Sequence, residues 1–180
     1  MPLEPLDTWQ QTLKQLEQVG HQDWAQDFSQ WLSERSTSKL QLMPVMGPVS
    51  FTFQKSVFEA RLREFRPVGK PREAALAWAG AWEAAVNASA MVVGTGAFLG
   101  APVPVTMWAV ATAVIDASSV QAGKKVLIQK LSDAKFVAKA EESEIAEAFR
   151  MAFLTLTATV TGVCMTYPPA PLVGPLLPTA

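Results

Sequence analysis

The stretch AAVNASAMVVGTGAFLGAPVPVTMWAVATAVI (residues 84–115) decides how the rest of this sequence is interpreted, because it contains no charged residue. A second uncharged stretch covers residues 151–180. Charged residues make up 17% of the chain, whereas soluble domains usually contain about 25%. The deficit is therefore local, and it marks two segments that must be covered by a core, by lipid or by another protein.

Length and composition exclude several classes of protein. The 180 residues suit a single domain, and a hydrophobic content of 49% excludes intrinsic disorder. A formal net charge of −1 argues against a nucleic-acid partner. The single cysteine, Cys164, excludes an intrachain disulfide framework, and the single histidine, His21, excludes a histidine-rich metal site. No metal, cofactor or catalytic residue is predicted.

The first part of the chain predicts helices followed by a β-hairpin. Apolar residues recur at helical spacing within residues 1–36, which indicates two amphipathic helices. Alternation with period two then predicts a hairpin over about 39–57. Residues 57–66 favour a helix that starts with a capping box at Ser56 and Glu59, while the alternation of their apolar and charged residues also fits a strand.

Residues 71–167 are expected to form an apolar, mainly helical region. Pro71 suits the first position of a helix over about 71–92, and a further helix is predicted over about 104–121. The lysine-rich segment that follows is also amphipathic and helical. Residues 154–166 are ambiguous, because threonine alternates there with apolar residues, which argues for a strand after a helical start.

The helix over 71–92 has two further features. Gly80, Ala84 and Ala88 recur every four residues, and small residues at this spacing let another backbone approach closely. The segment from Glu73 resembles the segment from Glu144, 71 residues later, because each has an acidic start and two aromatic residues four positions apart. Whether this similarity reflects a duplication is left open.

These patterns together predict a mainly α fold with a small β component (α+β). A helical bundle, one β-hairpin and an extended proline-rich C-terminal arm are expected. Residues 1–167 would form the single domain and residues 168–180 the arm. The five prolines of the arm exclude a regular helix or a central strand.

Two features resemble functional sites but have simpler interpretations. Asp116 follows the apolar stretch and would suit a buried catalytic carboxylate, but it also suits the point where a helix emerges into water. The basic residues of segment 55–72 would suit phosphate contacts. Glu59 and Glu64 are interleaved among them, however, at the spacing of helical ion pairs. We therefore expect no enzymatic activity.

Two functional hypotheses explain the uncharged segments. In the first, the protein is a structural subunit of a larger assembly, such as a virion or phage capsid, neck, tail or baseplate, or a related injection machine. Segments 84–115 and 151–180 would contact copies of the chain or other subunits. The interface candidates are Trp78, Trp82, Trp108, Tyr167, Pro168, Pro169, Pro171, Leu172, Val173, Leu176 and Leu177.

In the second hypothesis, the protein is a small membrane-inserting pore or lysis protein with a re-entrant apolar hairpin. A spanning helix needs about 20 apolar residues, and neither uncharged segment provides a clean span of that length. The N-terminal residues lack a basic region followed by an apolar one, so no secretory signal is predicted. The expected location is the cytoplasm at synthesis and then a particle, with a membrane as the alternative.

Overall fold

The computed structural model of the chain describes residues 4–19, 23–36, 38–42, 45–65, 71–93, 97–98, 108–132, 142–164 and 170–175. Helices provide most of the regular structure in these ranges. They are α1 (Leu6–Val19), α2 (Trp24–Ser36), α3 (Lys55–Glu64), α4 (Pro71–Asn87), α5 (Ala117–Leu131) and α7 (Glu142–Leu154). The fold is thus mainly α with a smaller β component, which confirms the predicted class.

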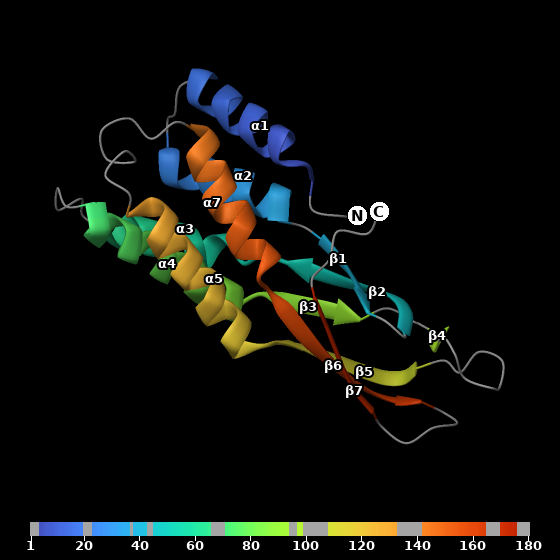
Figure 1. Cartoon of the computed structure of the whole chain (residues 1–180). Coiled ribbons are helices and arrows are strands. Elements are labelled where there is room, and N and C mark those ends of the chain that lie inside the picture. Colours follow the sequence, from blue (N-terminus) through green and yellow to red (C-terminus); the bar gives the residue numbers. More distant parts are fainter. Residues whose placement is uncertain are drawn as a thin grey trace.

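The described strands form two antiparallel sheets. They are β1 (Ser38–Leu42), β2 (Val45–Thr52), β3 (Ala90–Val93), β4 (Ala97–Phe98), β5 (Trp108–Ile115), β6 (Thr157–Cys164) and β7 (Ala170–Pro175). The first sheet has the order β1-β2-β3, with β4 also paired to β2, and the second has the order β5-β6-β7. Strand β3 lies against β5 and β1 against β7, so the outer strands of the two sheets adjoin. The helices gather at one end of the molecule, and the β5-β6-β7 sheet extends away from them (Figure 1).

A strand–helix–helix–strand order occurs twice in the described chain. Strands β2 and β3 enclose α3 and α4, and β5 and β6 enclose α5 and α7, with an antiparallel strand pair in each unit. The units meet where α4 packs against α5. In the first unit Gln54 N–H donates to Ser89 Oγ at 3.1 Å, and in the second Asp116 N–H donates to the Thr157 carbonyl at 2.9 Å. Helices α4 and α7, which carry the sequence similarity, therefore occupy equivalent places in the two units.

The core is built around aromatic side chains from several helices. Phe28 of α2 is 1% exposed, and its ring lies 5.3 to 6.1 Å, centroid to centroid, from those of Trp31, Phe58, Trp78 and Phe149. Burying such a side chain contributes about 1.5–3 kcal/mol. The aromatic spacing of residues 24–31 thus marks a core stripe, and α2 is held against α3, α4 and α7 by it.

Most predicted elements are present, but several details are wrong. The helix predicted over 71–92 ends at Asn87, and Ala90–Val93 form strand β3. The one predicted hairpin is only part of the β structure, which forms two sheets. The helices within residues 1–36, the hairpin β1–β2 and the helix α3 are confirmed. The capping box is not, because α3 begins at Lys55 after Gln54, and Gln54 makes no side-chain capping hydrogen bond.

The helix predicted over 104–121 is wrong for residues 108–115, whereas residues 117–121 do form the start of α5. Residues 108–115 form β5, because Val110, Thr112 and Val114 alternate there with alanines and the strand pairs with β6, with one irregularity between Trp108 and Val110.

Two further regions of the chain contain strands. Thr157–Cys164 is β6, which settles the ambiguity at 154–166 in favour of a strand after a helical start. Ala170–Pro175 of the expected arm is β7, an outer strand of its sheet. Proline is compatible with an outer strand because one side of such a strand makes no ladder hydrogen bonds.

Candidate interaction surface

The two uncharged segments of the sequence meet in one sheet. Strand β5 comes from the first segment, β6 and β7 come from the second, and β6 pairs with both neighbours. None of these three strands contains a charged residue, and among all described strands only β1 does, at Lys39. The tertiary structure thus converts two separate uncharged stretches into one continuous surface, which we call the uncharged sheet.

One face of the uncharged sheet is open to solvent at Val114, whose side chain is 65% exposed. Val114 pairs with Thr159, and Thr159 with Val173, so the three residues lie on the same face. The pairs Thr112–Thr161 and Val110–Val163 continue that face away from the helices. The opposite face carries Ala158, which is fully buried. Val114 thus marks an outer face of the uncharged sheet, and Ala158 marks the inner face towards the core.

Asp116 fixes the position of this sheet relative to the helices. Its carboxylate accepts hydrogen bonds from Thr157 Oγ1 at 2.6 Å and from Thr159 Oγ1 at 2.7 Å. Ser119 Oγ donates to the Asp116 carbonyl at 2.7 Å and accepts from Thr157 N–H at 3.1 Å. Asp116 lies between β5 and α5, and these contacts with β6 give it a structural role at the junction of strand and helix.

Two ion pairs join neighbouring helices. Lys124 Nζ of α5 lies 2.6 Å from Glu83 of α4, and Lys130 Nζ lies 2.8 Å from Glu147 of α7. The hydrogen bond from Lys124 lowers the pKa of Glu83 below its ordinary value of 4.5, and it outweighs the opposing effect of partial burial. These pairs hold α4, α5 and α7 together at the end of the molecule away from the outer part of the sheet.

The basic residues of α3 make the ion pairs that their spacing predicts. Arg63 pairs with Glu59 at 2.8 Å and with Asp23, and Arg61 pairs with Glu64 at 2.9 Å. The hydrogen bond from Arg63 lowers the pKa of the Asp23 carboxyl group. The pattern of a solvated helix with ion pairs is therefore confirmed, and these guanidinium groups already have carboxylate partners.

The predicted tryptophans on α4 lie in and beside the core. Trp82 is fully buried, and its ring lies 5.7 Å from that of Phe153. Trp78 is partly buried and its ring contacts those of Trp24 and Phe28, at 5.3 and 5.4 Å. Side chains in these positions stabilise the subunit itself. Trp82 offers no surface to a neighbour, because a neighbour reaches only exposed atoms.

Four of the other predicted interface residues belong to strands of the uncharged sheet. Trp108 begins β5, and Pro171, Leu172 and Val173 belong to β7. The remaining candidates lie outside the described residues, namely Tyr167, Pro168, Pro169, Leu176 and Leu177. The sequence candidates omitted Val114, although its place in an alternating valine and threonine run is the signal that would have identified it.

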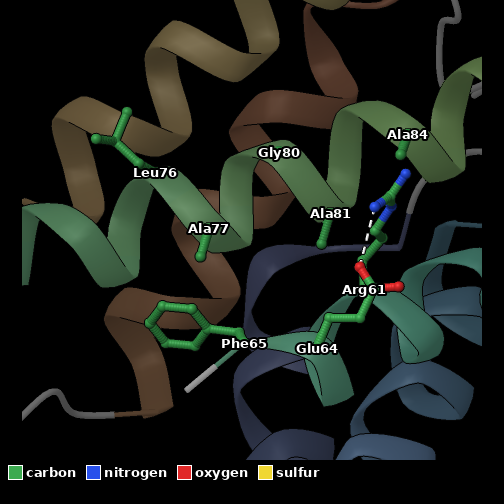
Figure 2. A pocket seen from close by; sticks show the side chains of 8 residues that line it. All are labelled: Arg61, Glu64, Phe65, Leu76, Ala77, Gly80, Ala81 and Ala84. Carbon is green, nitrogen blue, oxygen red and sulfur yellow. Dashed lines mark hydrogen bonds and ion pairs between the residues drawn. The ribbon is translucent and has the colours of Figure 1, made fainter. Parts of the chain in front are cut away.

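A second exposed apolar feature lies on the helical side. Helices α3 and α4 border a cavity of about 360 Å³ lined by Phe65, Leu76 and Gly80 among others. Figure 2 shows α4 running across this cavity, with Phe65 near one end and Arg61 reaching towards Ala84 at the other. Leu76 is 46% exposed, and a methyl group added at Gly80 would meet no atom within 4 Å. We call this feature the α4 groove.

Side chains that could bind a metal ion were sought among the described residues. These residues contain no group of three histidine, cysteine, aspartate or glutamate side chains that could hold a metal ion. His21 lies outside the described residues, and Cys164 is the last residue of β6. Within the same ranges, no helix combines the length and the apolar character needed to cross a bilayer.

Comparison with known proteins adds no family assignment. No family model, no curated protein and no solved structure matches the chain.

Proposed function

We propose that this protein is a non-enzymatic structural subunit of a larger protein assembly of the virion type, such as a capsid, neck, tail or baseplate. The outer face of the uncharged sheet would contact neighbouring copies or other subunits. The observation that carries this proposal is the union of two uncharged segments in one sheet whose outer face exposes Val114.

The composition of the outer face supports a protein contact. An antiparallel sheet with one face in water normally alternates hydrophobic residues inside with polar residues outside. Here the strand positions in line with Val114 by register are valines, threonines and two prolines, with no charge along β5, β6 or β7. The cores of protein–protein interfaces are depleted in charged residues in the same way. A neighbouring subunit would remove these residues from water.

The direct test places a charge on this face. Val114→Lys is expected to leave the fold intact, because the side chain is mostly exposed and surface substitutions usually change stability by about 0.5 kcal/mol or less. Size-exclusion chromatography with light scattering should show a multimer for the natural sequence and a smaller species for the variant. The matched control is Ala122→Lys, which adds the same charge at an exposed position of α5.

A substitution tests the contact more cleanly than truncation. Deletion of residues 168–180 would also remove β7, which pairs with β6 over Thr157–Gly162. A natural chain that stays monomeric in buffer at every concentration would overturn the proposal. So would loss of assembly in both lysine variants alike. Flotation of the purified chain with liposomes would instead favour the membrane-inserting alternative.

A further inference from the structure

We infer that α1 is an exchangeable arm, which leaves α7 of its own chain and docks in the same way on α7 of a second copy. The partner is therefore another copy of this chain, and a reciprocal exchange of this kind gives a closed two-fold dimer. This inference goes beyond the proposed function, because it uses the helical end of the molecule and not the uncharged sheet.

Helix α1 is attached mainly to a segment near the other end of the sequence. It packs on α7 and only slightly on α2, which follows it directly in the chain. Figure 1 shows α1 at the edge of the group of helices, beside α7. Helix α2 is held without α1, because the ring of Phe28 contacts rings of α3, α4 and α7. Helix α1 can therefore leave as a unit while α2 stays in place.

The site that α1 occupies, which we call the α1 seat, is formed by two helices and includes Trp31 and Arg35 of α2 and Arg150 and Phe153 of α7. The fully buried Trp9 enters it, and its ring lies 5.6 Å from that of Trp31 and 6.2 Å from that of Phe153. Both of these rings are also held from outside α1. Trp31 stacks on Phe28 at 5.3 Å, and Phe153 lies 5.7 Å from Trp82. The α1 seat is therefore formed before any α1 enters it.

Polar contacts give the α1 seat its specificity for this helix. Glu4, just before α1, pairs with Arg35, and its carbonyl accepts a hydrogen bond from Arg150 Nε at 3.0 Å. Trp31 Nε1 donates to Thr12 Oγ1 at 3.0 Å. These contacts fix where α1 begins and which way it is turned. The α1 of a second copy has the same residues, so it makes the same contacts on this seat.

Two buried donors at the α1 seat lower the cost of release. Trp9 Nε1 and Arg35 Nε are buried and have no hydrogen-bond partner in the part of the chain that the structure describes. Buried polar groups in proteins are nearly always paired, because an unpaired one loses its bonds to water without replacement. Undocking of α1 returns both donors to water. Release of α1 is thus easier than release of a helix whose interface is fully paired.

Cross-linking between chains tests the exchange. In a Cys164→Ser background, Pro5→Cys and Met151→Cys each place a thiol at an exposed position next to the Glu4–Arg150 hydrogen bond. Two chains, each with one of these cysteines, are refolded together from urea, so that slow opening cannot hide the exchange. They are then treated with a bis-maleimide. Mass spectrometry should find the link from position 5 to position 151 between two chains.

The controls separate exchange from docking within one chain. A chain with both cysteines should form the same link internally, which shows that the reagent spans the two positions. Ala122→Cys, at an exposed position of α5, should give little cross-linking when it replaces Met151→Cys. A link that forms only within the double-cysteine chain, at every chain concentration used for refolding, would overturn the inference.

A second pair of variants tests the role of Trp9. Trp9→Ala should reduce the link between chains by about tenfold or more, because it removes the ring contacts with the α1 seat. Gln11→Ala, at an exposed position of α1, should leave the link unchanged. Native-state hydrogen exchange on the natural chain should show α1 amides about tenfold less protected than those of α7. An unchanged link in Trp9→Ala, or equal protection of the two helices, would contradict the release of α1 as a unit.

The two proposals fail in different experiments. If Val114→Lys has no effect on assembly while the link between chains forms, the sheet contact is wrong and the exchange of α1 stands. If that link is absent while Val114→Lys reduces the assembled mass, the reverse holds.

Discussion

Replacement by alanine is predicted to change the free energy of unfolding in opposite directions at two glycines in the middle of helices. Gly123 of α5 is buried against two other helices, whereas Gly80 of α4 faces open space. A Cβ atom at Gly123 would lie 2.9 Å from the Ala152 carbonyl oxygen, 2.8 Å from Thr155 Oγ1 and closer still to the Trp82 ring. The same atom at Gly80 would have no neighbour within 4 Å.

The expected magnitudes follow from these contacts. Alanine in place of glycine favours an exposed helix by about 0.5–1 kcal/mol, so Gly80→Ala should raise the free energy of unfolding by about that amount. At Gly123 the same gain is opposed by overpacking, which typically costs about 1–3 kcal/mol. The Ala152 carbonyl belongs to the backbone of α7 and cannot rotate away. Movement of Thr155 would weaken its 2.7 Å hydrogen bond to that carbonyl, at a further cost of about 1 kcal/mol.

Gly123→Ala is therefore expected to lower the free energy of unfolding by about 1–3 kcal/mol. Urea denaturation followed by far-ultraviolet circular dichroism measures both variants, at a chain concentration low enough to avoid self-association. Equal slopes of free energy against urea concentration would show that the folded states are comparable. A Gly123→Ala variant as stable as the natural chain would refute the close packing of α5 against α4 and α7.

Two further predictions concern polar contacts. Asp116→Ala should lower the free energy of unfolding by about 2 kcal/mol, the usual scale for hydrogen bonds to a charged group, because it removes the acceptor for Thr157 and Thr159. Urea denaturation measures this loss. An unchanged midpoint would contradict the role of Asp116 at the junction of strand and helix. The Glu83–Lys124 pair should show a favourable coupling free energy at pH 7 in a double-mutant cycle of Glu83→Gln and Lys124→Met. Since the folded-state pKa of Glu83 lies below 4.5, this contribution is present above pH 4.5 and is lost as the pH falls through the lowered value. A coupling that does not weaken as Glu83 becomes protonated would contradict this explanation.

Helices with a clear apolar stripe could be predicted from the sequence. The spacing of aromatic residues over 24–31 identified a core face, because a stripe of that kind has to be buried wherever the helix lies. The spacing of Glu59 and Arg63 likewise identified an ion pair, because residues four apart on a helix are neighbours. Both are local properties, and both are confirmed.

The strand at 108–115 could not be predicted in the same way. Trp108, Ala111 and Ile115 fit a helical face as well as a strand, because alanine suits both structures and the run is short. Its pairing partner, β6, lies more than 40 residues further along the chain. A local pattern contains no information on a partner so distant, so the prediction of a helix failed there.

Which residues lie on the candidate surfaces could be seen only in the tertiary structure. Val114 and Leu76 look like ordinary core residues in the sequence, and Trp82 looks as available as Trp78. The structure exposes the first two and buries Trp82 completely, because α4 packs against α5 and turns that side inward.

The sequence by itself determined that two segments carry no charge and cannot both remain in water, since composition is independent of conformation. It also determined the helical stripes that build the aromatic core. Only the tertiary structure decided that the two segments become neighbouring strands, because antiparallel pairing of β5 with β6 joins residues far apart in the chain. That pairing places one face of the sheet towards the core and leaves the other at the surface, where a partner can reach it.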